Sequence, residues 1–345
     1  MTLFCNRRLE MMRDQVRFGL IGTGRIGQVH AASIAADPDA TLSWVADPYP
    51  AGAESVAARY GGTATDSPER LLDSAEVDAV LVAAPTPTHV TLIEACIDAG
   101  LPVLCEKPID LDIARVDALR PKVAASSVPV ALGFNQRFDP AFAETRTRVA
   151  TGEIGELEHL SITSRDPGPP PADYIATSGG IFRDMTIHDF DMARFFLGEI
   201  VEVSATGARL FDEGAREHGD YDTVAIVLRA ASGAIATITN SRHSAIGYDQ
   251  RLEALGAEGL LLVANAPSSL VSVSTSAAVE AKRPYLDFFL ERYAEAYVRE
   301  LAEFIKLVRG EESTSPTFED GRAALIIADA AQRSAEEGAV IRLTG

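Results

Sequence analysis

Short apolar runs alternate with helical patterns from residue 16 to residue 134. The runs are VRFGLIG, TLSWVAD, DAVLVAA, PVLCEKP and PVALGF, and segments between them, such as RIGQVHAASIAAD and PTHVTLIEACIDAG, space their apolar residues as a helix does. Strands in strict alternation with helices form a parallel sheet that is covered on both faces. The alternation therefore predicts a doubly wound α/β domain over residues 16–134.

The pattern changes after Phe138-Asp139-Pro140. A helical pattern over 140–151 leads to the strand LEHLSITS and a proline-rich loop. From residue 200 to about 275, β-rich runs follow one another across Gly-containing turns; they are VEVSATGARL, DTVAIVLRA, AIATITNS and RLEALG. Successive strands with short links favour an antiparallel sheet. With two helical patterns at about 287–308 and 318–337, residues 135–345 predict an α+β domain whose sheet is large, open and mostly antiparallel.

The composition limits the partners and the compartment. At 345 residues the chain is long for one core, which suggests two domains. The net charge of −19 argues against nucleic acid or an anionic membrane as a partner, since both need clustered Lys and Arg. The three cysteines, Cys5, Cys96 and Cys105, are scattered and lack metal-ligand spacing, which fits a cytoplasmic protein without a metal site.

No membrane span or targeting segment is predicted. No apolar run approaches the roughly 20 residues that cross a bilayer. Residues 1–15 carry basic residues but no apolar stretch after them, so they are interpreted as a loose extension and not as a secretory signal. Met1, Met11 and Met12 are alternative start residues within it.

A glycine loop joins the first predicted strand to the first helix. It reads Gly22-Thr-Gly24-Arg-Ile-Gly27, and the next strand ends in Asp47. In such a unit the glycines permit a tight turn and a close approach of the backbone to a pyrophosphate at the helix N-terminus. Asp47 follows Gly22 by 25 residues (47 − 22), near the separation at which a carboxylate binds the ribose hydroxyls of NAD and repels the 2′-phosphate of NADP. The loop therefore predicts NAD as the cofactor.

Two further segments follow predicted strands. AAPTPTHV (83–90) follows the run DAVLVAA, and CEKP (105–108) closes the next strand. The carboxyl ends of parallel strands are where such sheets bind ligands. Lys107, between Glu106 and Pro108, fits either a plain surface ion pair or, beside a nicotinamide, a cation that stabilises charge on a substrate oxygen.

Residues 184–191, DMTIHDFD, place Asp184, His188 and Asp191 at spacings of four and three. At about 3.6 residues per turn these side chains share one face of a helix. Three interpretations fit that face: a solvated pair of Asp184 and His188, a metal site, or acid–base catalysis in which the aspartate orients an imidazole that moves a proton. The segment alone does not choose among them.

Together these segments resemble the Gfo/Idh/MocA oxidoreductases, a family named for glucose–fructose oxidoreductase and inositol dehydrogenase. The resemblance begins at about Val16 and is carried by GTGRIG, PTPTH, EKP, GFNQRFDP, DMTIHDFD and TFEDGRAALIIADAAQRS. Within the family, CEKPIDLD, GGIFRDMTIHDFDMARFFLG and GYDQRLEALG are most similar to bacterial inositol 2-dehydrogenases. The resemblance implies an NAD-binding Rossmann domain followed by a domain for substrate binding and oligomerisation.

The resemblance also implies the roles of particular residues. Lys107, Asp184 and His188 are expected to be catalytic: His188 takes the proton of a ring hydroxyl, Asp184 holds the imidazole and Lys107 stabilises the oxyanion as hydride leaves for NAD⁺. With myo-inositol the product is the 2-keto-inositol, scyllo-inosose. The expected cofactor contacts are Gly22, Gly24, Arg25, Ile26, Gly27, Asp47, Thr86, His89, Glu106 and Lys107. The candidate polyol contacts are Asn135, Arg165, Asp166 and Tyr248. The role of Asp191 does not follow from the chemistry, and it is expected either to support a catalytic residue or to pack the helix.

Two positions depart from the family pattern. Ser164-Arg165-Asp166 stands where some inositol dehydrogenases have His-Arg-Asn, and Asn135-Gln136-Arg137 stands where relatives often have two arginines. The alternative substrates are therefore another polyol or sugar, such as scyllo-inositol, D-chiro-inositol or an aldose. A non-catalytic NAD-binding sensor is the alternative from another class, although such a protein would be expected to lack the lysine or the histidine.

The β-rich runs also bear on assembly. VEVSATGARL, DTVAIVLRA and AIATITNS carry more apolar positions than one buried face requires, and an exposed apolar patch of that size favours association. Since the resembling family often assembles with dihedral symmetry, a homotetramer is expected.

Overall fold

The computed structural model describes residues 15–343, which form two compact units. The first comprises residues up to 133 together with 297–318, and the second comprises 134–296 together with 319 onward. The extension predicted for residues 1–15 lies, apart from Gln15, outside the described residues. The units divide one residue from the predicted boundary, but the return of residues 297–318 to the first unit corrects the assignment of all of 135–345 to the second domain.

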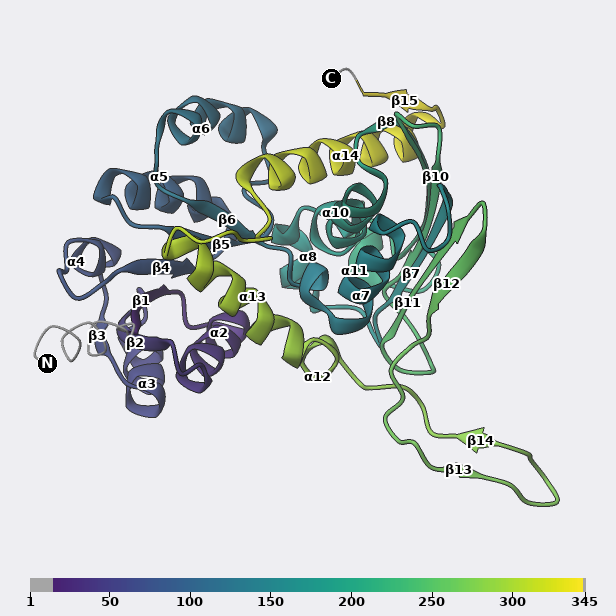
Figure 1. Cartoon of the computed structure of the whole chain (residues 1–345), viewed down its shortest axis with the longest axis horizontal. Helices are drawn as coiled ribbons and strands as arrows, with labels where there is room; N and C mark the ends of the chain where they lie inside the picture. Colours follow the sequence, from purple (N-terminus) through teal and green to yellow (C-terminus); the bar gives the residue numbers. More distant parts are fainter. Residues whose placement is uncertain (1–14, 344–345) are drawn as a thin grey trace, which may run out of the picture. The chain divides into compact units, whose positions relative to one another are not determined.

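A parallel sheet forms the centre of the first unit. Over the described residues it has six strands in the order β3-β2-β1-β4-β5-β6, and every neighbouring pair is parallel. Figure 1 shows helices α5 and α6 on one side of these strands and α2 and α3 on the other, the two-sided cover predicted from the alternation. The strands are β1 (Val16–Ile21), β2 (Ala40–Ala46), β3 (Thr63–Thr65), β4 (Ala79–Val82), β5 (Val103–Glu106) and β6 (Val130–Gly133). The helices are α2 (Arg25–Ala36), α3 (Pro50–Tyr60), α4 (Pro68–Leu72), α5 (His89–Ala99) and α6 (Ile113–Ala125).

Helix α13 (Ala294–Val308) supplies apolar side chains to the core of the first unit. Leu301, Phe304 and Ile305 are buried there, and the rings of Phe304 and Phe18 lie 6.1 Å apart. Burial of each such side chain contributes about 1.5–3 kcal/mol relative to exposure. This packing is the physical reason that the segment belongs to the first unit.

A second, mixed sheet organises the second unit. Over the described residues it has seven strands in the order β12-β11-β7-β10-β9-β8-β15, and all neighbours are antiparallel except β7 and β10. The mostly antiparallel sheet predicted from the sequence is therefore present. Its strands are β7 (Leu157–Arg165), β8 (Ile200–Ala208), β9 (Thr223–Ala230), β10 (Ile235–Ser241), β11 (Asp249–Gly256), β12 (Gly259–Val263) and β15 (Ile341–Arg342).

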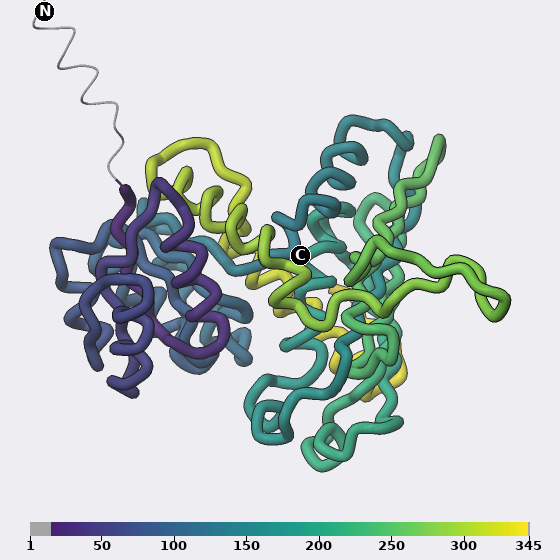
Figure 2. The backbone as a smooth tube through the Cα atoms, turned by 90° about the horizontal axis from the view of Figure 1, so that it is seen from below, coloured from purple at the N-terminus to yellow at the C-terminus, as the bar shows by residue number. Residues whose placement is uncertain are grey.

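Helices and one long arm complete the second unit. The arm lies between β12 and α12, and Figure 2 shows it extending away from the rest of this unit. It contains the short strands β13 (Ser272–Val273) and β14 (Ala281–Lys282), which pair antiparallel. The helices are α7 (Pro140–Ala150), α8 (Ala172–Ser178), α9 (Ile181–Asp184), α10 (Thr186–Leu197), α11 (Glu213–Glu217), α12 (Phe289–Arg292) and α14 (Phe318–Glu337).

The thiols of the first unit are buried. Cys96 and Cys105 are free cysteines, and Cys5 lies outside the described residues. Burial raises the pKa of the Cys96 thiol to about 12 and that of Cys105 well above its usual value. Neither thiol is therefore suited to act as a nucleophile. Among residues 15–343, no helix is long and apolar enough to cross a membrane.

Candidate active site

The glycine loop leaves room for a ligand at the start of α2. Gly24 occupies the N-cap without a side-chain cap, and a Cβ on it would meet no atom within 4 Å. Gly22 has φ +98°, and a Cβ there would lie 2.5 Å from the carbonyl oxygen of Ala83. A Cβ on Gly27 would lie 2.1 Å from the carbonyl oxygen of Gly22. Open space before uncapped backbone N–H groups suits a pyrophosphate, so the loop fits NAD.

Asp47 directly follows β2 and is tied to the glycine loop. Its Oδ2 accepts hydrogen bonds from the backbone N–H of Thr23 at 2.8 Å and from the Thr23 hydroxyl at 2.6 Å. Its Oδ1 accepts one from the backbone N–H of Tyr49 at 2.9 Å. A carboxylate offers about four lone-pair positions, so these bonds fix its orientation and leave acceptor capacity for a ribose.

The loop that carries Lys107 is held by a buried histidine. Lys107 follows β5 and is half-buried. The ring of His89, 1% exposed, lies with Nδ1 2.7 Å from the carbonyl oxygen of Pro108 and Nε2 2.8 Å from that of Ala84. The imidazole therefore bridges the loop after β4 and the loop after β5. Both ring nitrogens are engaged in this bridge, and the contact of His89 with the cofactor stays a prediction.

Glu106, the last residue of β5, lies in a buried polar cluster. Its Oε1 is 2.7 Å from Nε2 of His30 on α2, and the His30 ring contacts Tyr297 of α13 edge-on. Glu300 of α13 is 1% exposed, and neither of its carboxyl oxygens has a hydrogen-bond partner among the described residues. Burial first, and then the charge of Glu106, raise the pKa of Glu300 well above its usual value. Helices α2 and α13 thus fix the strand end that precedes the lysine.

The segment DMTIHDFD forms two helices and not the single predicted one. Asp184 ends α9, His188 and Asp191 lie in α10, and Met185 separates the two helices. Oδ1 of Asp184 accepts a hydrogen bond of 2.8 Å from the hydroxyl of Tyr174, and Oδ2 accepts one of 3.2 Å from Arg242. A carboxylate with a buried arginine as partner is not part of a solvated face, so the first of the three interpretations is wrong.

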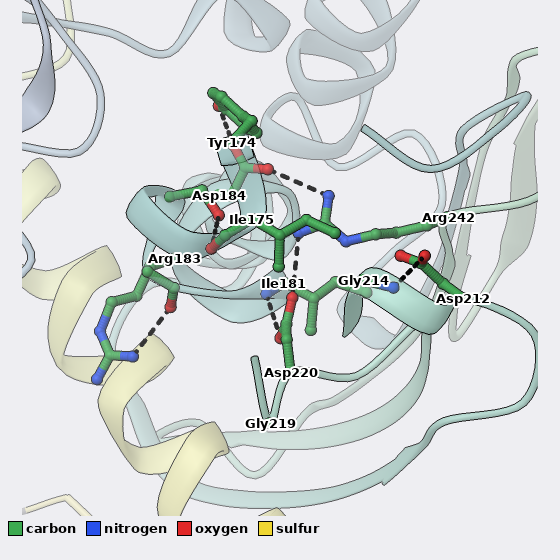
Figure 3. A network of polar contacts seen from close by, with 12 residues as sticks. Tyr174, Ile175, Ile181, Arg183, Asp184, Asp212, Gly214, Gly219, Asp220 and Arg242 are labelled. Carbon is green, nitrogen blue, oxygen red and sulfur yellow. Dashed lines mark hydrogen bonds and ion pairs between the residues drawn. The ribbon is translucent and has the colours of Figure 1, made fainter. Parts of the chain in front are cut away.

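Arg242 follows β10 and connects Asp184 to the start of α9. Its guanidinium is 1% exposed and lies between Asp184 and Asp220, as Figure 3 shows. Asp220 also accepts a hydrogen bond of 2.9 Å from the backbone N–H of Ile181. Burial would lower the pKa of Arg242, but the nearby carboxylates, Asp184 foremost, raise it above its usual value. Sequence analysis missed this arginine; its only signal was a cation directly after a strand.

His188 and Asp191 both lie in α10, and they contact different residues. The half-buried ring of His188 contacts Phe134 edge-on at 6.0 Å between centroids. Asp191, 1% exposed, binds Arg137 through two contacts of 2.7 and 2.5 Å, and Asp320 of α14 lies 3.2 Å from the same guanidinium. Asp191 thus ties α10 to Arg137 through a buried ion pair.

The candidate polyol residues of the second unit lie at strand ends. Arg165 ends β7 and pairs with Asp249, which starts β11, at 3.0 Å. Tyr248 immediately precedes β11 and is buried, and Asp166 follows Arg165. Asn135 is also buried, in the 3₁₀ turn before α7. The sheet register therefore brings Arg165, Asp166 and Tyr248 to the same end of β7 and β11.

Each unit assembles its own share of the predicted residues. In the first unit, Arg25 and Ile26 form the first turn of α2, and Thr86 lies in the 3₁₀ turn before α5.

Over residues 15–343, no group of three or more His, Cys, Asp or Glu side chains has an arrangement that could hold a metal ion.

Comparison with known proteins identifies both units. Residues 16–134 match the description "Oxidoreductase family, NAD-binding Rossmann fold", and residues 142–262 match "GFO/IDH/MocA C-terminal domain". The chain belongs to the GFO/IDH/MocA oxidoreductase family. The glycine loop, Asp47 and the lysine loop thus lie in the family's NAD-binding domain, and the protein is an NAD-binding oxidoreductase.

Individual relatives of this GFO/IDH/MocA protein are similar over nearly the whole chain. An inositol 2-dehydrogenase of Rhizobium meliloti (strain 1021) is 47% identical over 93% of this chain and 97% of its own. The crystal structure of a myo-inositol dehydrogenase from Corynebacterium glutamicum is 49% identical, with a TM-score of 0.93 over 96% of this chain and 99% of that one. A scyllo-inositol dehydrogenase from Lactobacillus casei, solved with NAD(H) and scyllo-inositol, is 29% identical, with a TM-score of 0.87 over 95% and 99%.

Proposed function

We propose that this protein oxidises myo-inositol to scyllo-inosose with NAD⁺ as hydride acceptor. The observation that carries the proposal is the support of Asp184: a buried arginine and a tyrosine hydroxyl fix this carboxylate one turn before His188. The chain that contains this pair also has the NAD-binding domain and is nearly half identical to inositol 2-dehydrogenases.

The residues of the first unit that would hold NAD are those of the glycine loop, the start of α2 and Asp47. Backbone N–H groups at the start of α2 would bind the pyrophosphate, and Asp47 would accept hydrogen bonds from the ribose. When bound, the nicotinamide supplies the hydride acceptor that this chain's side chains lack. The Lys107 ammonium would stabilise negative charge on the substrate oxygen.

His188 would act as the general base. Its neutral imidazole accepts the hydroxyl proton as the carbon is oxidised, and a positioned base contributes roughly 10²–10⁴-fold to such a step. Asp184 is a suitable orienting group, because Tyr174 and Arg242 restrict its own rotation. Asn135, Arg165, Asp166 and Tyr248 would supply hydrogen bonds to the remaining hydroxyls; Arg165 keeps donors beyond the one that binds Asp249.

The substrate is tested by comparing kcat/KM with NAD⁺ over a panel of polyols. We expect myo-inositol to be the preferred substrate and to exceed deoxy-inositols strongly, since a site that bonds each hydroxyl leaves polar groups unpaired when one is missing. The alternatives in the panel are scyllo-inositol, D-chiro-inositol and aldoses. An aldose whose kcat/KM exceeded that of every inositol isomer by about tenfold would overturn the inositol assignment. If no polyol is oxidised, the alternative of a non-catalytic NAD-binding sensor is favoured.

The cofactor preference is a separate prediction that depends on Asp47. NAD should be preferred over NADP, because this carboxylate would lie beside the 2′-phosphate. Asp47→Ser should narrow the ratio of kcat/KM for the two cofactors, whereas Asp73→Ser, which changes an exposed carboxylate of the same unit, should leave it unchanged. Because both cofactors are measured on one preparation, partial unfolding of a variant does not alter the ratio. Equal kcat/KM values in the unaltered protein would contradict the role of Asp47.

We also propose that the protein is a homotetramer. Apolar side chains are exposed on the strands of the second sheet, including Val227 at 46%, Leu260 at 52% and Leu262 at 65%. Light scattering should give about four times the monomer mass of 36.8 kDa. Val227→Glu should lower the mass, and Tyr49→Glu, at an exposed position of the first unit between β2 and α3, should not. A monomer mass for the unaltered protein at micromolar concentration would refute the proposal.

A further inference from the structure

Asp189, the residue after His188, lies in a buried polar network that the proposed reaction does not use. The carboxyl group is 1% exposed. Its Oδ1 lies 2.7 Å from the hydroxyl of Ser164 on β7, and its Oδ2 lies 2.6 Å from Nδ2 of Asn240 on β10. These two contacts fasten α10 to the adjacent parallel strands of the sheet.

The network continues through two further buried side chains. The Ser164 hydroxyl is also 3.0 Å from Oε1 of Gln250 on β11, and the same Oε1 accepts a hydrogen bond of 3.1 Å from the Tyr293 hydroxyl. Tyr248, a candidate polyol residue, hydrogen-bonds to Tyr293. Ser164, Asn240, Gln250 and Tyr293 are each at most 3% exposed, so the network is shielded from bulk solvent.

With Oε1 of Gln250 as the acceptor for the Tyr293 hydroxyl, the network requires one proton more than an ionised Asp189 would supply. Ser164 has a single hydroxyl hydrogen, yet its oxygen lies within hydrogen-bond distance of two acceptors, Asp189 Oδ1 and Gln250 Oε1. If Asp189 is a neutral acid, its Oδ1–H donates to Ser164 and the Ser164 hydroxyl donates to Gln250. Oδ2 then accepts from Asn240, and every contact has a donor and an acceptor.

The electrostatic surroundings of Asp189 also favour a neutral carboxylic acid. The side chains that bond to its carboxyl, Ser164 of β7 and Asn240 of β10, are uncharged. Tyr293 is a titratable neighbour, and no hydrogen bond or ion pair joins a cation of residues 15–343 to this carboxyl. An isolated carboxylate in such surroundings carries a large desolvation penalty. Burial raises the pKa of Asp189 to about 7, although its hydrogen bonds with Ser164 and Asn240 oppose the rise.

We propose that Asp189 is a positioning residue that holds the His188 helix on the sheet as a neutral carboxylic acid. Ionisation of Asp189 removes the hydrogen that Ser164 accepts and places a buried charge one residue from His188. The sheet ends that this network ties together also carry the candidate polyol residues Arg165 and Tyr248. The packing of α10, the helix that carries His188, against the sheet therefore depends on pH near neutrality.

The sign of the effect on stability follows from the two pKa values. The acid is protonated up to about pH 7 in the folded protein, and an unfolded aspartate ionises near about 3.9. The contribution of Asp189 to stability is therefore complete below about pH 4 and is lost as the pH rises through about 7. Asp189→Asn does not titrate, and its amide donates to Ser164 as the neutral acid does.

The test compares the melting temperature of Asp189→Asn with that of the unaltered protein from pH 5 to pH 9. We expect the difference to shift by several degrees in favour of the variant as the pH rises. The matched control is Asp191→Asn, equally buried on the same helix but paired with Arg137, which should melt lower at every pH. A difference that does not change with pH, or that shifts in favour of the unaltered protein, would overturn the neutral acid. Either outcome would be explained by a Gln250 amide in the rotated orientation, in which its Nε2–H donates to Ser164 and Asp189 is ionised.

A second measurement is spectroscopic. In protein labelled with carbon-13 at the aspartate carboxyl, infrared difference spectra between pH 6 and pH 9 should show the loss of a protonated-carboxyl C=O band. The label separates this band from Glu300, whose pKa is also raised, and the absence of the band from Asp189→Asn separates it from Asp191, whose pKa is raised by burial. Absence of a labelled band at pH 6 would overturn the proposal even if Asp189→Asn fails to fold.

The positioning role is tested by the pH profile of kcat with myo-inositol, and only this readout rests on the proposed function. The ratio of kcat for Asp189→Asn to that of the unaltered protein should increase severalfold between pH 6 and pH 9, because only the unaltered protein ionises at this position. A constant ratio would overturn the positioning role. If neither protein oxidises any polyol, the proposed function fails, and the melting and infrared series still decide the protonation of Asp189.

Discussion

Replacement of His188 by alanine is expected to lower kcat with myo-inositol by roughly 10²–10⁴-fold, the contribution of a positioned general base. Binding of NADH should change little, because the glycine loop and Asp47 belong to the first unit and His188 to the second. The single tryptophan, Trp44 on β2, lies three residues before Asp47. Its fluorescence therefore reports nucleotide binding independently of turnover.

The control for this prediction is His218→Ala, which removes an exposed imidazole from the same unit and should leave kcat unchanged. A melting curve separates loss of the base from loss of the fold, since the His188 ring also contacts Phe134. Near-normal kcat in His188→Ala would show that this imidazole does not move the proton. A large loss of NADH binding with unchanged kcat would assign it to the cofactor.

The fold was predictable because the apolar periodicities of helices and of strands are visible within short segments of sequence. Five of the six strands of the first sheet appear in the sequence as short apolar runs; β3 (Thr63–Thr65) was not predicted, because three residues are too few to form such a run. The helix α14 (Phe318–Glu337) coincides with the predicted helical pattern at 318–337. The placement of α13 was not predictable in the same way. Its apolar stripe would suit either unit, and only the three-dimensional fit of Phe304 against Phe18 decides which core it completes.

The chemistry-bearing residues were predictable only where a motif marks them. The glycine loop and Lys107 follow strands directly, so their positions were evident from the order of elements. Arg242 was not evident, because its importance arises from Asp184 and Asp220, which lie 58 and 22 residues away in the chain. The protonation of Asp189 was equally hidden, since it depends on three strands that meet only after folding.

Loss of the carboxylate at position 191 should destabilise the protein strongly. Asp191→Asn leaves the guanidinium of Arg137, 9% exposed, without its bidentate partner, and Asp320 alone remains beside it. Removing one member of a buried ion pair costs on the order of 3 kcal/mol, because the other charge stays desolvated. Urea unfolding should show this loss, and kcat should also fall because the same helix carries His188.

The exposed ion pair of Arg148 and Glu153 tests whether the loss of stability in Asp191→Asn arises from the burial of the ion pair or from its short contact. Its closest contact is 2.5 Å, the same as that between Arg137 and Asp191, but both side chains are over 40% exposed. Glu153→Gln should therefore leave the urea midpoint almost unchanged, since water solvates the arginine that remains. In the double variant Arg137→Met with Asp191→Leu, much of the stability should return, because no buried charge is left unpaired. If Asp191→Asn proved as mild as Glu153→Gln, the charge of Arg137 would be shown to reach water, and Asp191 would be no more than a surface partner on the helix that carries His188.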